Sequence, residues 1–400
     1  MKKFSLKLRN ENISFTIAVL TLSAFFCLRT TLSNDATIYY SAGEAVQNGL
    51  SPWNNDLNPF EQYLYGPIHG LALGLFSNLS HYFFVLLVKT LSCIALIIAC
   101  LTFLKNKREA LVVYCLVILT FAFRSNIQYG AIGGLASIVA ICLLYPSVSG
   151  KQVPRMFGQI LLLDFKPHIY WFTFLYRSTR IRLTTAIVSA SAIYLLIYFV
   201  NAKLSLFNWI ETLTYRKDGL DQDPTLISPS MLILGRYIPP IYLFLLSFIL
   251  VLAASIVAHR GNLKKGENFV LVYGTVLLST PYLHTIDTLG LSLLLLLVIQ
   301  RTKQKTVFIV ILILFNMIWS NSLTLNLAVG LIAISFMIYA KWNVDFKIYA
   351  ISYFSYVLIN VIWFNLLQEN YIPNTFFALV LTANVLVVYR LTKIENGNHK

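Results

Sequence analysis

Apolar runs of about 14 to 24 residues, separated by short polar connections, recur along the whole 400-residue chain. A helix of about 20 residues spans the hydrocarbon core of a bilayer, which is roughly 30 Å thick. The runs therefore predict about 12 transmembrane helices, the shorter ones tilted or extended into their polar flanks. They lie near 13–33, 81–104, 110–123, 129–145, 183–201, 237–258, 268–283, 287–300, 306–319, 323–340, 348–367 and 374–390.

The polar interruptions are too short to form a soluble domain. The longest are about 30 residues, at 34–63 and 202–236, and a segment of that size cannot bury a core of its own. Apolar residues make up 58% of the chain and charged residues only 12%, well below the charged share of a soluble protein. We therefore predict an all-α integral membrane protein, with one polytopic domain over 1–400, a first outer loop at 34–80 and a second at 202–236.

The basic residues follow the connections between the runs. The net charge is +15, and 23 of the 31 Lys and Arg residues lie in every second connection. This is the positive-inside pattern, in which basic connections remain in the cytoplasm. It predicts that both termini are cytoplasmic, and it explains the basicity without a nucleic-acid partner. The basic connections are 1–12, 105–109, 146–156, 177–182, 259–268, 300–305, 341–347 and 390–400.

Residues 156–176 do not fit a single crossing, because both of their flanks are basic. Pro167 stands in the middle of the segment and breaks a helix there. We expect a re-entrant hairpin that starts and ends on the cytoplasmic side. Lys166 and His168 lie near its tip.

The first outer loop contains two further helical segments. Residues 64–79 are apolar but short and rich in Gly and Pro, and counting them as a crossing would move the basic connection 105–109 outside. A helix from Asp35 to Asn48 would place Tyr39, Ala42 and Val46 on one face, which predicts an interfacial amphipathic helix.

Cysteine usage and the N-terminus add no cofactor or targeting signal. The five cysteines lie inside apolar runs without the paired spacing of a metal site, so we expect buried thiols, no disulfide framework and no metal. Residues 1–27 resemble a signal peptide but lack a small-x-small cleavage site, which indicates an uncleaved first helix.

Several charges remain outside the cytoplasmic connections. Arg124, Lys166 and Arg236 each stand next to a helix break or terminus, where cations can converge on one anion. The carboxylate of Asp35 follows the first crossing directly; a helix cap and a catalytic acid–base group both explain it. Snorkelling toward the membrane surface is an equal alternative to function for Lys89, Lys203 and Lys217.

His284 and Asp287 are three residues apart between two crossings. On one helical turn they could pair, with the carboxylate orienting the imidazole. Two ligands do not fill the coordination sphere of a metal, so a structural pair is the better interpretation.

Four segments, in this order, resemble the GT-C superfamily of membrane glycosyltransferases, and within it glycosyltransferase family 87. The family's first outer loop has an Asp after the first helix, then a Tyr, small residues, Gly-x-x-Pro and Tyr-x-Pro. NIQYG at 126–130 resembles its Gly-Gln-x-Asn segment, with Ile127 in place of Gly. LLLDFKPHIYWFTFLYR at 161–177 resembles its Lys-Pro hairpin, and STPYLHTIDTLGLSLLLL at 279–296 its Ser-Pro-x-x-x-His segment, with Thr280 inserted. The matching positions of the first loop are Asp35, Tyr39, Ala42, Gly49, Pro52, Tyr65 and Pro67.

This resemblance implies a fold and an activity. The fold would be a GT-C-like bundle. The enzyme would transfer a hexose from a polyprenyl-phosphate sugar to a glycan or glycolipid acceptor at the outer membrane face, and the family resemblance favours mannose as that hexose. Asp35 would act as the general base, and the anomeric centre would be inverted. Fixed positive charge would hold the departing phosphate, so no metal or other cofactor is implied. The donor phosphate site would comprise Lys166, Arg124, Arg236, His168 and His284, and the sugar and acceptor site Tyr39, Tyr40, Tyr65, Gln128 and Asp287.

Two other classes compete with this interpretation. An O-antigen-type polymerase should have larger outer loops with paired Arg-rich signatures, which the loop at 202–236 meets only in part. A transporter should show two halves with corresponding broken helices, whereas the sequence has one such break. The resemblance and the short loops favour a multi-pass protein of a bacterial inner membrane, with the active site facing outward.

Overall fold

The computed structural model describes residues 34–53, 63–104, 107–119, 121–144, 152–175, 180–214, 237–260 and 265–291, with single positions between 17 and 28 and at 228, 230, 234, 293, 294, 385 and 389. Within this part, the elements are thirteen α-helices and one 3-10 helix, which confirms the all-α class there. The predicted crossings between 306 and 390 lie outside the described residues, apart from two positions of the last one.

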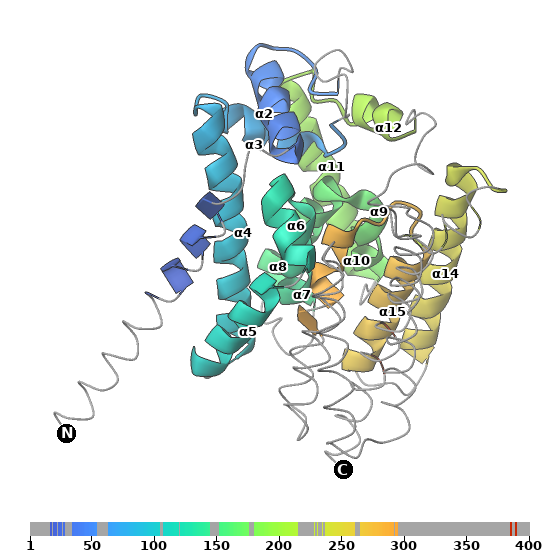
Figure 1. Cartoon of the computed structure of the whole chain (residues 1–400). Helices are drawn as coiled ribbons and strands as arrows, with labels where there is room; N and C mark the ends of the chain where they lie inside the picture. The colour runs from blue at the N-terminus through green and yellow to red at the C-terminus, as the bar shows by residue number, and fades with distance from the viewer. Residues whose placement is uncertain are drawn as a thin grey trace, which may run out of the picture.

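Two described helices are long and apolar enough to cross a membrane. They are α4 (His81–Phe103) and α14 (Pro240–Arg260), which lie on opposite sides of the bundle in Figure 1. The 23 residues of α4 correspond to a length of about 35 Å. Both helices leave large apolar side chains exposed on their outer faces, among them Ile94 and Ile249.

Helices α2 (Asn34–Gln47) and α3 (Pro67–Phe76) pack side by side at one end of the bundle (Figure 1). The helix predicted after the first crossing is therefore present, but its predicted membrane-facing side is buried. Tyr39, Ala42 and Val46 belong to an apolar cluster inside the protein with residues of α3 and α4. The interfacial interpretation of α2 is thus replaced by a buried helix of the outer loop, because its apolar face has protein neighbours.

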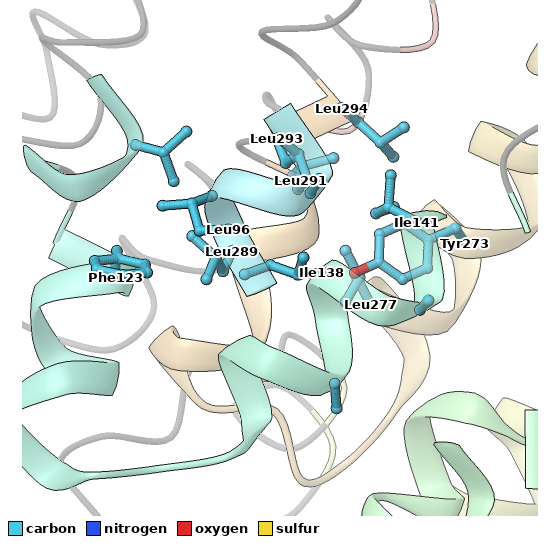
Figure 2. Packing of buried hydrophobic residues seen from close by; sticks show 14 of the residues in the cluster. Leu96, Phe123, Ile138, Ile141, Tyr273, Leu277, Leu289, Leu291, Leu293 and Leu294 are labelled. Atoms are coloured by element: carbon cyan, nitrogen blue, oxygen red, sulfur yellow. The ribbon is translucent and has the colours of Figure 1, made fainter. Parts of the chain in front are cut away.

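The main apolar core lies between α4, α5 (Lys107–Leu119), α6 (Phe121–Tyr129), α7 (Gly133–Leu144) and α15 (Lys265–Ser279). Figure 2 shows how side chains of α4, α6, α7 and α15 meet leucines that follow the short 3-10 helix η3 (Thr285–Thr288). The predicted crossing at 110–123 consists of α5 and the first turn of α6, which the apolar pattern did not separate. The core is labelled in Figure 2 at Leu96, Phe123, Ile138, Ile141, Tyr273, Leu277, Leu289, Leu291, Leu293 and Leu294.

The predicted break at Pro167 is present. Helix α8 (Gln152–Phe165) ends just before it, and two short helices, α9 (Pro167–Tyr170) and α10 (Phe172–Leu175), follow. Lys166 joins α8 to α9 with a non-helical backbone, because the residue before a proline is disfavoured in the helical region. Helix α9 packs back on α8.

The remaining helices are α11 (Arg180–Val200) and α12 (Leu206–Thr214). The predicted runs at 183–201, 237–258 and 268–283 correspond to α11, α14 and α15. Helix α12 lies in the second outer loop, where the pattern predicted no helix. Its indole at Trp209 donates a hydrogen bond to the Leu64 carbonyl at 3.0 Å, which attaches α12 to the first outer loop.

Candidate functional site

Three segments that are far apart in the sequence meet at the turn between α6 and α7. The Ile132 N–H donates to the hydroxyl of Tyr39 on α2 at 3.4 Å. Lys166 Nζ, at the α8–α9 break, donates to Asp287 Oδ1 of η3 at 2.7 Å. A Cβ built on Gly133 would lie 2.6 Å from Asp287 Oδ1 and 3.1 Å from Lys166 Nζ. The absence of a side chain at Gly133 therefore allows the backbone to approach the Lys166–Asp287 ion pair closely. Through the neighbouring Ile132, the same turn also contacts α2.

Asp164 joins the first outer loop to the same break. Its carboxylate is fully buried and accepts the N–H groups of Ile68 at 3.0 Å and His69 at 2.6 Å, at the start of α3. Its carbonyl accepts the Gly66 N–H at 2.8 Å, and the Tyr194 hydroxyl donates to Oδ1 at 3.3 Å. A Cβ on Gly66 would overlap the carboxylate, so only glycine fits there. An anion at a helix N-terminus meets unpaired N–H groups and a favourable dipole.

Burial moves two pKa values in this region, one at the helix break and one at the start of α3. Burial raises the pKa of Asp164 to about 7, although the three donated hydrogen bonds oppose the shift. Burial also lowers the pKa of His69 to about 3, so its ring is neutral near pH 7. The neutral ring hydrogen-bonds through Nδ1 with the Tyr63 hydroxyl at 2.8 Å.

Asp35 lies in the first turn of α2, half-buried, one turn before Tyr39. The pKa of Tyr39 is raised first by burial and then by the nearby Tyr65 and Asp35. The Asp35 carboxylate is thus within electrostatic reach of the hydroxyl that contacts Ile132. The sequence prediction of a carboxylate near the start of this helix is confirmed, and its acid–base role stays a prediction.

The predicted sugar-binding tyrosines divide into two groups. The Tyr39 hydroxyl donates to Tyr65 at 2.8 Å, and both rings pack edge-on against each other and against His69. Tyr39 is buried and Tyr65 half-buried, so Tyr65 is the more accessible of the two. Tyr40 instead packs against His81 and Phe84 of α4, away from this pair. It packs α2 against α4, and its role in sugar binding stays a prediction.

Asp287 pairs with Lys166 in addition to its contact with His284. Its carboxylate accepts the His284 backbone N–H at 3.0 Å as well as the Lys166 ammonium. His284 and Asp287 cap η3 reciprocally, so the carboxylate orients the backbone of the turn as well as the lysine. Asp287 is fully buried, and its predicted contact with the sugar or acceptor stays a prediction.

His168 anchors α9 to the segment before η3. The His168 Nε2 donates to the Tyr282 carbonyl at 3.0 Å. The Thr280 hydroxyl donates to the backbone carbonyl of His168 at 3.4 Å. Its ring packs edge-on against Tyr282 and Phe244. The N–H that we expected to face a phosphate is therefore directed to a backbone carbonyl.

Sequence reasoning missed Asn126, which organises the turn after α6. Its side chain accepts the Gly134 N–H at 3.0 Å and donates to Ser92 on α4 at 3.2 Å. The available signal was the short polar stretch that contains Asn126, between the apolar runs at 110–123 and 129–145. Gln128, which we predicted to contact the sugar, is exposed, and the described contacts do not join it to the ion pair.

Two predicted phosphate ligands cannot be placed beside Lys166. Arg124 lies on α6, but its side chain is outside the described residues, as is the whole of Arg236. Lys89, by contrast, is buried on α4, so it does not snorkel to the membrane surface. Among the described residues no group of three or more His, Cys, Asp or Glu side chains could hold a metal ion.

In comparisons of this chain with known proteins, no family model, no curated protein and no solved structure matches.

Proposed function

We propose that this protein is a membrane-embedded glycosyltransferase of the GT-C type, which resembles family 87 and uses a polyprenyl-phosphate hexose as donor. The observation that carries the proposal is the junction at Ile132 and Gly133. It connects the helix of Asp35, through Tyr39, to the Lys166–Asp287 ion pair. A carboxylate and a buried cation, held on separate elements around one turn, are what transfer from a sugar phosphate requires.

The membrane setting rests on the pattern of apolar runs and on the two long apolar helices. In the proposed arrangement the 12 or so crossings form one bundle, with both termini in the cytoplasm of a bacterium. Helices α2, α3 and α12 lie at the outer face. The lipid donor then reaches the α8–α9 break from within the bilayer.

In the proposed reaction Asp35 takes a proton from the acceptor hydroxyl as that oxygen attacks the anomeric carbon. The bond from the anomeric carbon to the phosphate oxygen breaks, and the polyprenyl phosphate leaves with the electron pair. Attack from the side opposite the leaving group inverts the centre. The proton remains on Asp35 until it passes to water.

Lys166 is the cation that we assign to the departing phosphate. An ammonium group has three N–H donors, and the bond to Asp287 uses one of them. Because Asp287 already neutralises the lysine, the phosphate charge needs a further cation. Arg124 and Arg236 are the candidates that the sequence offers, and Asp287 becomes a residue that holds Lys166.

The test is a transfer assay with radiolabelled polyprenyl-phosphate mannose and glucose on the purified full-length protein in lipid nanodiscs. We expect the wild type to transfer label and Asp35→Asn to lose at least 100-fold, within the range for a general base, while it still binds donor. Glu44→Gln is the matched control, because Glu44 is exposed on the same helix. A wild type that transfers no sugar refutes the activity, and an active Asp35→Asn variant removes Asp35 from the mechanism.

A further inference from the structure

Asp164 has no part in the reaction outlined above, yet its hydrogen bonds join the start of α3 to the helix break that carries Lys166. It lies two residues before Lys166 and is fully buried. Its partners Ile68 and His69 are 96 and 95 residues earlier in the chain. A buried carboxylate is costly unless its oxygens are paired, and here both oxygens accept backbone N–H groups.

The contacts of Asp164 reach the acid–base side of the proposed site through Tyr65. Its carbonyl accepts the N–H of Gly66, the residue that follows Tyr65. The Tyr65 hydroxyl accepts a hydrogen bond from Tyr39, one turn after Asp35 on α2. A displacement of α3 would therefore move the tyrosine pair relative to Lys166.

We propose that Asp164 is a positioning residue, which clamps the start of α3 to the α8–α9 break and so fixes the distance between the Asp35 helix and Lys166. This inference rests on the proposed function for its effect on catalysis, and on the hydrogen bonds alone for the clamp. Gly66 permits this close approach, because a Cβ there would overlap the carboxylate.

The test uses Asp164→Asn in the full-length protein in nanodiscs. The amide keeps one acceptor oxygen, but its NH₂ group faces the second backbone N–H, so the pair of bonds cannot both persist. Tyr194→Phe is the control, since it removes only the longest bond, at 3.3 Å. Both variants keep the size of the side chain.

The rate of amide hydrogen exchange at residues 66–70 measures directly whether the backbone N–H groups of this segment remain hydrogen-bonded to Asp164. This measurement does not depend on any enzymatic activity. We expect at least tenfold faster exchange there in Asp164→Asn and less than twofold change in Tyr194→Phe. Unchanged protection in Asp164→Asn would overturn the clamp.

The transfer assay then tests whether Asp164 positions the groups of the proposed active site. In the folded fraction of Asp164→Asn, kcat should fall at least tenfold while the donor KM changes less than threefold, because Lys166 and its partner remain. A KM effect alone, or a kcat within twofold of wild type despite faster exchange, would overturn the positioning role. If the wild type transfers no sugar, the activity proposal fails, and the exchange result still decides the clamp.

Discussion

At the level of single residues, we expect substitutions in the Lys166–Asp287 pair to lower the stability of the protein strongly, because both side chains are buried. Removal of one partner of a buried ion pair leaves an uncompensated charge and costs about 3–5 kcal/mol. Loss of both partners can be nearly neutral. Replacement of Lys166 alone should therefore affect the stability of the fold as well as the donor.

We therefore predict that Lys166→Met lowers the stability of the protein by a few kcal/mol and also abolishes donor binding. The double variant Lys166→Met/Asp287→Asn should recover most of the stability, since no buried charge is left, but none of the donor affinity. Thermal unfolding in detergent and equilibrium donor binding measure the two effects. A double variant as unstable as the single one would mean that the pair is not what stabilises this turn.

The opposed pKa shifts of His69 and Asp164 predict opposite pH slopes in two variants. The pKa of His69 falls from 6.5 to about 3, so between these values only the unfolded state binds that proton, and stability falls as pH falls. The pKa of Asp164 rises from 3.8 to about 7, so there only the folded state binds that proton, and stability falls as pH rises. Between about pH 4 and 6.5 the two contributions cancel.

Asp164→Asn should consequently gain stability as pH rises from 4.5 to 6.5, relative to wild type, by about 1.4 kcal/mol per pH unit. His69→Gln should lose stability over the same range by a similar amount. Thermal unfolding at three pH values gives the slopes, which are insensitive to any constant loss of contacts. Parallel curves for the two variants would contradict the burial of these groups in the folded state.

Much of the site was not visible in the sequence, because its contacts are non-local. Asp35, Lys166 and Asp287 were each selected as chemically significant. Lys166 and Asp287 are 121 residues apart in the sequence, so only the folded structure shows that they form an ion pair. Asp164 was given no role, since its partners are backbone N–H groups, which have no signature in the side-chain pattern.

At the level of elements, the apolar pattern located α4, α11, α14 and α15 well, and proline chemistry located the end of α8. It failed for α2, whose apolar face is the same whether lipid or another helix covers it. Packing against α3 determines that protein, not lipid, covers this face of α2. The hydrophobic pattern of the sequence does not identify such a neighbour. The opposite holds for α12, which leaves apolar side chains exposed within the part of the chain that the structure describes.

We predict that α12, not α2, lies in the outer membrane interface. Trp209 attaches α12 to the first outer loop, while Phe207 is 82% exposed and Ile210 is also exposed on the other side. A fluorophore on a cysteine at 207 or 210 should be quenched strongly by brominated lipids, and one at Glu44 of α2 should be quenched weakly. Equal quenching at all three positions would contradict this arrangement.

At the level of the whole molecule, the distribution of charge predicts the orientation of α14. Its last turn carries His259 and Arg260, at the start of a basic connection that the positive-inside pattern assigns to the cytoplasm. The other end of α14 follows the second outer loop. The side of the membrane that holds Asp35 therefore depends on an orientation that labelling can measure.

Labelling of introduced cysteines in intact cells should show residue 50 outside and residue 260 inside. Leu50 ends the turn after α2 and is exposed, which makes it a better reporter than the half-buried Asp35, and Arg260 is exposed at the end of α14. A membrane-impermeant maleimide should label Leu50→Cys directly, and Arg260→Cys only after the membrane is permeabilised. The unmodified protein is the control, because three of its five cysteines are buried and the other two half-buried. The reverse pattern would place Asp35 and Lys166 in the cytoplasm, where a donor presented at the outer face could not reach them, and would exclude the proposed reaction.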